Sequence, residues 1–182
     1  MDTPGPRVRR PSAVLFDRDG TLVVDVPYNG DPAAVTPMPG AVEAVARVRA
    51  AGLPTAVVSN QSGIARGLLD ARRVAAVNAR VDAVFGAFDA WCVCPHGPDD
   101  GCDCRKPRPG LVLEAARRLG VAAEDVVVIG DIGADVAAAA AAGARGILVP
   151  TPITRREEVT AAREVAPDLA AAVEAALTGG AS

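Results

Sequence analysis

The sequence has few aromatic residues: Phe, Trp and Tyr together make up 3% of its 182 residues. The core must therefore be built from Ala, Val and Leu, of which Ala-rich stretches favour helix and Val-rich runs favour strand. An excess of basic residues is also missing, since the formal net charge is −3. Nucleic-acid-binding proteins usually carry a basic surface and aromatic stacking platforms. We therefore predict that nucleic acid is not a partner of this protein.

Long apolar runs are absent too. None approaches the roughly 20 residues of a membrane-spanning helix, and residues 1–11, which are rich in Pro and Arg, lack the apolar segment of a signal peptide. We expect a flexible tail over residues 1–11 and a single domain over residues 12–182, a length sufficient for its own core. The protein is predicted to be a cytoplasmic monomer that does not bind membranes.

Short apolar runs alternate with helical patterns along the whole chain. The expected strands cover residues 13–16, 53–58, 87–93, 126–129 and 147–149, and the expected helices cover residues 39–52, 70–85, 109–119, 137–142, 154–163 and 168–177. The helical stripes place Ala46 and Leu113 on buried faces. Strands that alternate with helices predict an α/β fold, with a mostly parallel sheet and helices on both faces.

Polar clusters follow three of these strands, at residues 17–21, 59–63 and 130–135. Each alone is also compatible with an ordinary polar turn. In a parallel sheet, however, the carboxyl ends of the strands share one edge, where α/β proteins bind ligands. Carboxylates of Asp17, Asp19 and Asp131 at that edge would repel one another without a cation, and their oxygens suit Mg²⁺. The three clusters together therefore predict a magnesium site.

The same residues suit phosphoryl transfer. An aspartate beside Mg²⁺ can attack phosphorus and form an aspartyl-phosphate. A second aspartate can protonate the leaving alkoxide and later deprotonate water. Lys106 offers a positive charge for the phosphate oxygens. The hydroxyl and amide groups of Ser59 and Asn60 form a plausible seat for an anion.

Four motifs carry a resemblance to a known family. Asp17-x-Asp19-Gly20-Thr21, Ser59-Asn60-Gln61, Lys106 and Gly130-Asp131-x-x-x-Asp135 resemble, in order, the four motifs of the haloacid dehalogenase (HAD) superfamily, over about residues 13–150. The resemblance implies a Rossmann-like HAD fold with a minimal cap. It implies that Asp17 is the nucleophile and Asp19 the general acid/base. It also implies that Ser59 and Lys106 bind the phosphoryl group.

The resemblance further implies a metal site. Mg²⁺ would be held by Asp17, Asp131 and the backbone carbonyl of Asp19, with Asp135 in support. No insertion is large enough for the cap that a mutase needs to exclude water. Water is therefore the expected phosphoryl acceptor, and the enzyme is expected to be a phosphatase.

All four cysteines and the only histidine lie between residues 92 and 104. Thiolates and imidazole favour a four-coordinate zinc ion, but spacing alone leaves five candidates for four places, and a disulfide or free thiols are alternatives. Cys94-Pro95-His96 followed by Cys102-x-Cys104-Arg105-Lys106 resembles the zinc loop of the HAD branch that contains heptose bisphosphate and histidinol-phosphate phosphatases. The resemblance implies that Cys94, His96, Cys102 and Cys104 bind a structural zinc ion. The loop would then deliver Arg105 and Lys106 to phosphate.

The resemblance to this branch also implies that the substrate is a small phosphorylated metabolite. A heptose bisphosphate that loses its 7-phosphate is the expected substrate, and histidinol phosphate or another phospho-sugar is the alternative. A nucleic-acid 3′-phosphatase and a non-catalytic zinc-bound scaffold are the other hypotheses. Asp25 and Tyr28 match the family's substrate loop. Val23 departs from that loop, because the heptose enzymes commonly have Asn there. Gly97 departs from the zinc loop, because the family often has a second His there.

Overall fold

The computed structural model describes residues 10–179. Most of the predicted tail therefore lies outside the described residues. Of its last two residues, Arg10 donates a hydrogen bond to the carbonyl of Ala51 at 3.4 Å, and Pro11 is buried.

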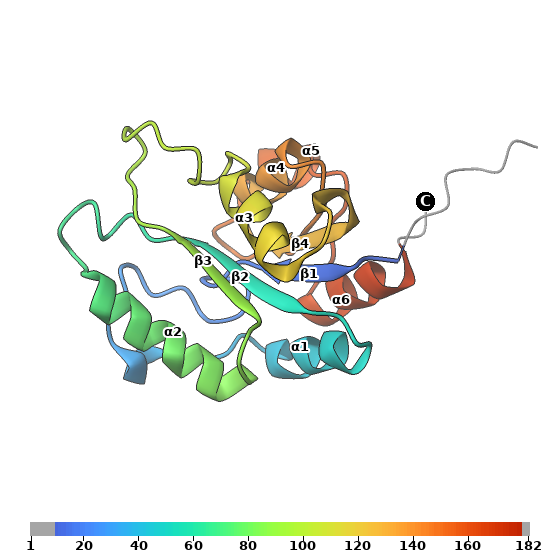
Figure 1. Cartoon of the computed structure of the whole chain (residues 1–182), viewed down its shortest axis with the longest axis horizontal. Helices are drawn as coiled ribbons and strands as arrows, with labels where there is room; N and C mark the ends of the chain where they lie inside the picture. The colour runs from blue at the N-terminus through green and yellow to red at the C-terminus, as the bar shows by residue number, and fades with distance from the viewer. Residues whose placement is uncertain (1–9, 180–182) are drawn as a thin grey trace, which may run out of the picture.

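The centre of the fold is a sheet of five parallel strands in the order β3-β2-β1-β4-β5 (Figure 1). The strands are β1 (Ala13–Phe16), β2 (Thr55–Asn60), β3 (Ala90–Cys94), β4 (Val126–Gly130) and β5 (Arg145–Leu148). The chain builds outward from β1 to β3 and then crosses back to place β4 on the other side of β1. This reversal opens a crevice at the carboxyl ends of β1 and β4. The predicted α/β class and parallel sheet are confirmed.

Helices cover both faces of the sheet (Figure 1). They are α1 (Ala41–Ala50), α2 (Ala71–Phe85), α3 (Gly110–Leu119), α4 (Gly133–Ala141), α5 (Arg156–Ala161) and α6 (Leu169–Thr178), with 3-10 turns η1 (Pro32–Ala34) and η2 (Ala123–Asp125). Helices α1, α2 and α6 contribute to one buried apolar cluster, and α3 and α4 contribute to the other. Among residues 10–179, no helix has the length and apolar character needed to cross a membrane.

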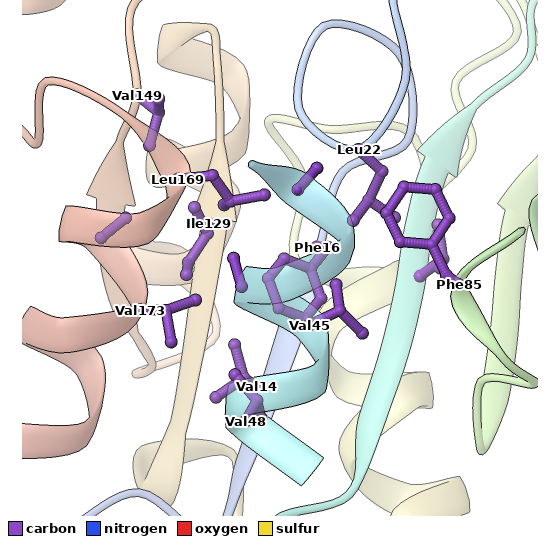
Figure 2. Close-up of a cluster of buried hydrophobic side chains, with 14 of the residues drawn as sticks. Val14, Phe16, Leu22, Val45, Val48, Phe85, Ile129, Val149, Leu169 and Val173 are labelled. Carbon is purple, nitrogen blue, oxygen red and sulfur yellow. The ribbon is translucent and has the colours of Figure 1, made fainter. Parts of the chain in front are cut away.

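Strand β1 connects the two halves of the core. Because side chains alternate along a strand, Val14 and Phe16 point into the cluster shared with α1, α2 and α6, as Figure 2 shows. Ala13 and Leu15 point into the cluster on the α3 and α4 side. All four are fully buried. The short apolar run before Asp17 therefore fixes the strand from which the site begins.

Several predicted boundaries and faces were wrong. Strand β2 continues beyond residue 58, because Ser59 and Asn60 still pair in register with β3. Helix α4 begins at Gly133 and not at residue 137, with Asp135 in its first turn. Leu113 is 45% exposed and Ala46 is also exposed. Hydrophobicity located these elements but did not reveal their polar ends or their rotation.

Little covers the crevice. Between β1 and α1, residues 17–40 form a loop that contains only η1 as regular structure. Met38 and Val24 nevertheless make backbone hydrogen bonds to Leu22 and Thr36, which anchor the loop. The expected minimal cap is confirmed, and the loop can reach the carboxyl ends of the strands.

Candidate active site

Lys106 lies at the centre of the site. Its ammonium donates to Asp17 Oδ1 and to Asp135 Oδ1, both at 2.6 Å, and to the carbonyl of Val58 at 2.8 Å. The side chain is 2% exposed. Burial alone would lower the pKa of Lys106, but the charges of Asp135 and Asp17 outweigh it and raise this pKa above its usual range. The lysine is therefore a permanent cation between two aspartates.

Three carboxylates gather around this cation. One oxygen from each of Asp17, Asp131 and Asp135 lies within 4.8 Å of the others, and all three residues are buried. Burial raises the pKa of Asp17 to about 7, against the opposing effect of Lys106. Burial and the charge of Asp17 raise the pKa of Asp131 to about 8. One ammonium does not balance three carboxylates, so the cluster favours a further cation, and its hard oxygen donors fit Mg²⁺.

The backbone around the cluster leaves room for the carboxylates. Gly20 has φ +85°, and a Cβ at this position would collide with the Asp131 carboxylate. A Cβ at Gly130 would collide with Asp135. The glycines of the two aspartate motifs therefore serve close packing at the strand ends.

Asp19 is held apart from the other three aspartates. Both of its carboxylate oxygens accept from Arg18, at 3.0 and 2.8 Å, and Oδ2 also accepts from Gln61 at 2.8 Å. Gln61 donates in turn to Ser59 Oγ at 2.8 Å. Asn60 exchanges two hydrogen bonds of 3.1 Å with the backbone of Lys106. Asn60 thus fixes the lysine's backbone, and Ser59 lies behind Gln61.

A cavity of about 320 Å³ opens above these groups. Its wall includes Asp17, Asp19, Asn60, Lys106, Asp131 and Asp135. The predicted residues Asp25 and Tyr28 also line it, from the loop after β1. Burial and the charge of Asp19 raise the pKa of Asp25. Ser59 and Arg105 are not part of the wall.

Several wall residues were not predicted as individual site residues. Gln61 and Ser62, which belong to the predicted polar cluster at residues 59–63, line the cavity, as do Arg18 and Ile153. A signal for Gln61 was present, since it stands directly after the predicted Ser59 and Asn60. Ile153 comes from the segment after β5, where no sequence pattern points to a site.

The predicted zinc ligands form a second cluster beside the first. Ligand atoms of Cys94, His96, Cys102 and Cys104 all lie within 4.8 Å of one another. Cys94 Sγ is 2.9 Å from Cys104 Sγ and 3.7 Å from Cys102 Sγ, and His96 Nδ1 is 3.3 Å from Cys104 Sγ. Burial and the neighbouring thiols Cys94 and Cys102 raise the pKa of Cys104 to about 12. Three thiols and one imidazole that converge in this way fit a closed, four-coordinate zinc site.

Two further residues of this segment, Cys92 and Arg105, lie outside the four-residue cluster. Cys92 is buried in β3, outside the four-residue cluster, and all four cysteines are free thiols. Arg105 donates to the backbone carbonyl of His96 at 3.2 Å. It therefore bonds within the cysteine loop, whereas the next residue, Lys106, reaches the aspartates.

Known proteins are similar to this chain in sequence and in fold. The family described as HAD-hydrolase-like matches residues 103–172. The D-glycero-beta-D-manno-heptose-1,7-bisphosphate 7-phosphatase of Pseudomonas putida is 40% identical over 147 residues, which cover 76% of this chain and 82% of the relative. The enzyme of the same name from Vibrio cholerae is 38% identical over 163 residues, which cover 82% and 88% of the two chains.

A solved structure agrees with these sequence matches. The D,D-heptose 1,7-bisphosphate phosphatase of B. bronchiseptica, in complex with magnesium and phosphate, has a TM-score of 0.80 and 35% identity, and the match covers 91% of this chain and 98% of that one. The parallel fold, the aspartates at its edge and these matches together define a HAD-like hydrolase. Within that class, the chain belongs to the family of the D-glycero-beta-D-manno-heptose-1,7-bisphosphate 7-phosphatases.

Proposed function

We propose that this protein is a Mg²⁺-dependent phosphatase that removes the 7-phosphate from D-glycero-beta-D-manno-heptose 1,7-bisphosphate. The observation that carries the proposal is the buried cluster of Asp17, Asp131, Asp135 and Lys106 at the floor of a cavity. The 35–41% identity to several phosphatases of that name supports the choice of substrate. A cytoplasmic location and a monomeric state remain part of the proposal.

Asp17 is the proposed nucleophile. Among residues 10–179, its carboxylate has one hydrogen bond, from Lys106 to Oδ1, so Oδ2 is free to attack phosphorus. The bond between phosphorus and the leaving oxygen breaks as the aspartyl-phosphate forms. The Lys106 ammonium offsets negative charge on the phosphoryl oxygens. Ser59 and Asn60 support this region, Ser59 through Gln61 and Asn60 through the backbone of Lys106.

Asp19 is the proposed general acid and base. It lines the same cavity as Asp17, so it can give a proton to the leaving alkoxide. It then takes a proton from the water that hydrolyses the aspartyl-phosphate. Water is consumed, and inorganic phosphate and the alcohol are released.

Asp17, Asp131 and the backbone carbonyl of Asp19 are the residues proposed to hold Mg²⁺. Thr21 Oγ1 donates to the carboxylate of Asp131 over a long distance of 3.5 Å, so this carboxylate is available as a ligand. Both oxygens of Asp135 are already engaged, by Lys106 and by the backbone N–H of Ile132, which suits a supporting role. When bound, the ion neutralises charge on the phosphoryl group and the aspartates.

We further propose that Cys94, His96, Cys102 and Cys104 hold a structural zinc ion. Lys106 follows Cys104 by two residues, so an ordered cysteine loop sets where the lysine enters the site. Arg105, Asp25 and Tyr28 are proposed substrate contacts. Asp25 and Tyr28 are supported by their place in the cavity wall, and Arg105 would have to leave the carbonyl of His96.

Substitution of the nucleophile tests the proposal. Asp17→Asn removes the attacking carboxylate but keeps its shape, so we expect release of phosphate from the heptose bisphosphate to fall by at least about 10⁴-fold. Circular dichroism and thermal unfolding control for the fold. Normal phosphate release by folded Asp17→Asn would overturn the mechanism. Faster turnover of histidinol phosphate than of the heptose bisphosphate by the unsubstituted enzyme would instead overturn the substrate.

A further inference from the structure

Arg18, between the two aspartates of the first motif, is one of the largest side chains that the fold buries completely. It is 1% exposed. Its Nε and Nη2 donate to the two oxygens of the Asp19 carboxylate at 3.0 and 2.8 Å. Its Nη1 donates to Asn78 Oδ1 on helix α2 at 2.8 Å. A guanidinium buried to this degree is costly unless it is paired, and Asp19 is its carboxylate partner.

The two hydrogen bonds from Arg18 Nε and Nη2 to Asp19 form a fork, which fixes both the position and the plane of the Asp19 carboxylate. Two parallel hydrogen bonds from one guanidinium allow little rotation of the carboxylate. Gln61 adds a second hydrogen bond to Oδ2, at 2.8 Å. Within residues 10–179, Oδ2 therefore has two donors and Oδ1 has one. Oδ1 is the oxygen with a lone pair left, and this position can carry the proton that is given to the substrate.

The partly open carboxylate faces the cavity. The Asp19 side chain is 24% exposed, whereas Arg18 beneath it is almost inaccessible. Helix α2 anchors the far end of the guanidinium through Asn78, so the orientation of Asp19 is tied to the packing of a helix on the sheet. We infer that Arg18 is a positioning residue that aims Oδ1 of Asp19 at the leaving oxygen of the substrate. The inference rests on the proposed function, in which Asp19 protonates that oxygen.

The consequence depends on the leaving group. An alkoxide leaves only as it gains a proton, so a misaimed Asp19 slows cleavage of a sugar phosphate. A nitrophenolate leaves without a proton, so cleavage of p-nitrophenyl phosphate does not need Asp19 in this step. A merely structural role of Arg18 would affect both substrates alike. The value of kcat/KM isolates this difference, because it reports the steps up to formation of the aspartyl-phosphate and not its later hydrolysis.

The test substitutes Arg18→Lys, which keeps the buried charge but loses the fork. We expect kcat/KM for the heptose bisphosphate to fall by about 10²-fold, within the usual range for general acid catalysis, and kcat/KM for p-nitrophenyl phosphate to fall less than about threefold. Arg49→Lys is the matched control. Arg49 donates to the carbonyls of Gly86 and Ala87, away from the cavity. Its substitution should leave unchanged the ratio of the kcat/KM value for the heptose bisphosphate to that for p-nitrophenyl phosphate.

A second variant covers the case in which Arg18→Lys does not fold. Asn78→Asp has nearly the same shape and offers the guanidinium a competing carboxylate, so it should change the same ratio in the same direction. In addition, Arg18→Lys combined with Asp19→Asn should be no slower on the heptose bisphosphate than Asp19→Asn alone, since Arg18 acts through Asp19.

The possible results distinguish a failure of the inference about Arg18 from a failure of the proposed function. Equal losses on both substrates, or an unchanged ratio in folded variants, would overturn the role of Arg18 while leaving the phosphatase proposal intact. An additive loss in the double variant would do the same. An unsubstituted enzyme without activity on either substrate would overturn the proposed function itself, and the inference with it.

Discussion

Lys106 determines the charge balance of the site at the scale of a single residue. It is the only lysine in a chain with 19 Lys and Arg residues in total. Loss of the ammonium in Lys106→Met would leave Asp17 and Asp135 buried without a cation. We expect the free energy of unfolding of the metal-free protein at pH 8 to drop by about 3 kcal/mol, as is typical when one partner of a buried ion pair is removed. Urea denaturation of the unsubstituted protein and of Lys106→Met measures this difference in the free energy of unfolding.

The matched control is Arg47→Met. Arg47 pairs with Glu174 on the surface, with side chains 57% and 47% exposed, so its loss should cost at most about 1 kcal/mol. Equal losses in the two variants would contradict the central place of Lys106. At pH 5 the loss in Lys106→Met should shrink, because the unpaired carboxylates can take up protons.

At the scale of elements, the four proposed zinc ligands come from the last residue of β3 and from the segment that joins β3 to α3. We expect Cys104→Ser to remove bound zinc and to increase amide hydrogen exchange over residues 95–105, since a structural zinc contributes directly to folding. Metal analysis and hydrogen exchange by mass spectrometry measure both effects. Cys92→Ala is the control, because Cys92 lies outside the cluster. Equal zinc content in both variants would contradict the assignment.

The strands and helices also show which parts of the structure could be predicted from the sequence. Strands β1 and β4 were predictable because uncharged apolar runs end at Asp17 and Gly130, and parallel pairing then brings Asp17 and Asp131 to one edge. The cap of α2 was predictable from Asp70, which accepts from the N–H of Arg73. The hydrogen bond that anchors Arg18 to Asn78 was not predictable, because the two residues are 60 positions apart in the sequence. Only tertiary packing sets such contacts.

At the scale of the whole molecule, the fold buries more negative than positive charge at one edge of its sheet. Burial raises the pKa of Asp17 to about 7 and that of Asp131 to about 8, from an ordinary value of 3.8. A carboxyl whose pKa is raised in the folded state stabilises the fold fully below pH 3.8, and this stabilisation is lost as the pH rises through the folded value. The metal-free protein should therefore lose stability between about pH 4 and pH 8.

Magnesium should reverse this trend, because it binds the deprotonated carboxylates and competes with protons. We expect the rise in melting temperature caused by a fixed concentration of Mg²⁺ to grow from pH 6 to pH 8.5, and the apparent Kd for Mg²⁺ to fall over the same range. Thermal unfolding and calorimetric titration measure these two quantities. In Asp131→Asn the carboxylate is gone, so both dependences should flatten. A Mg²⁺ effect that is independent of pH in the unsubstituted protein would show that the buried aspartates are already ionised without the metal.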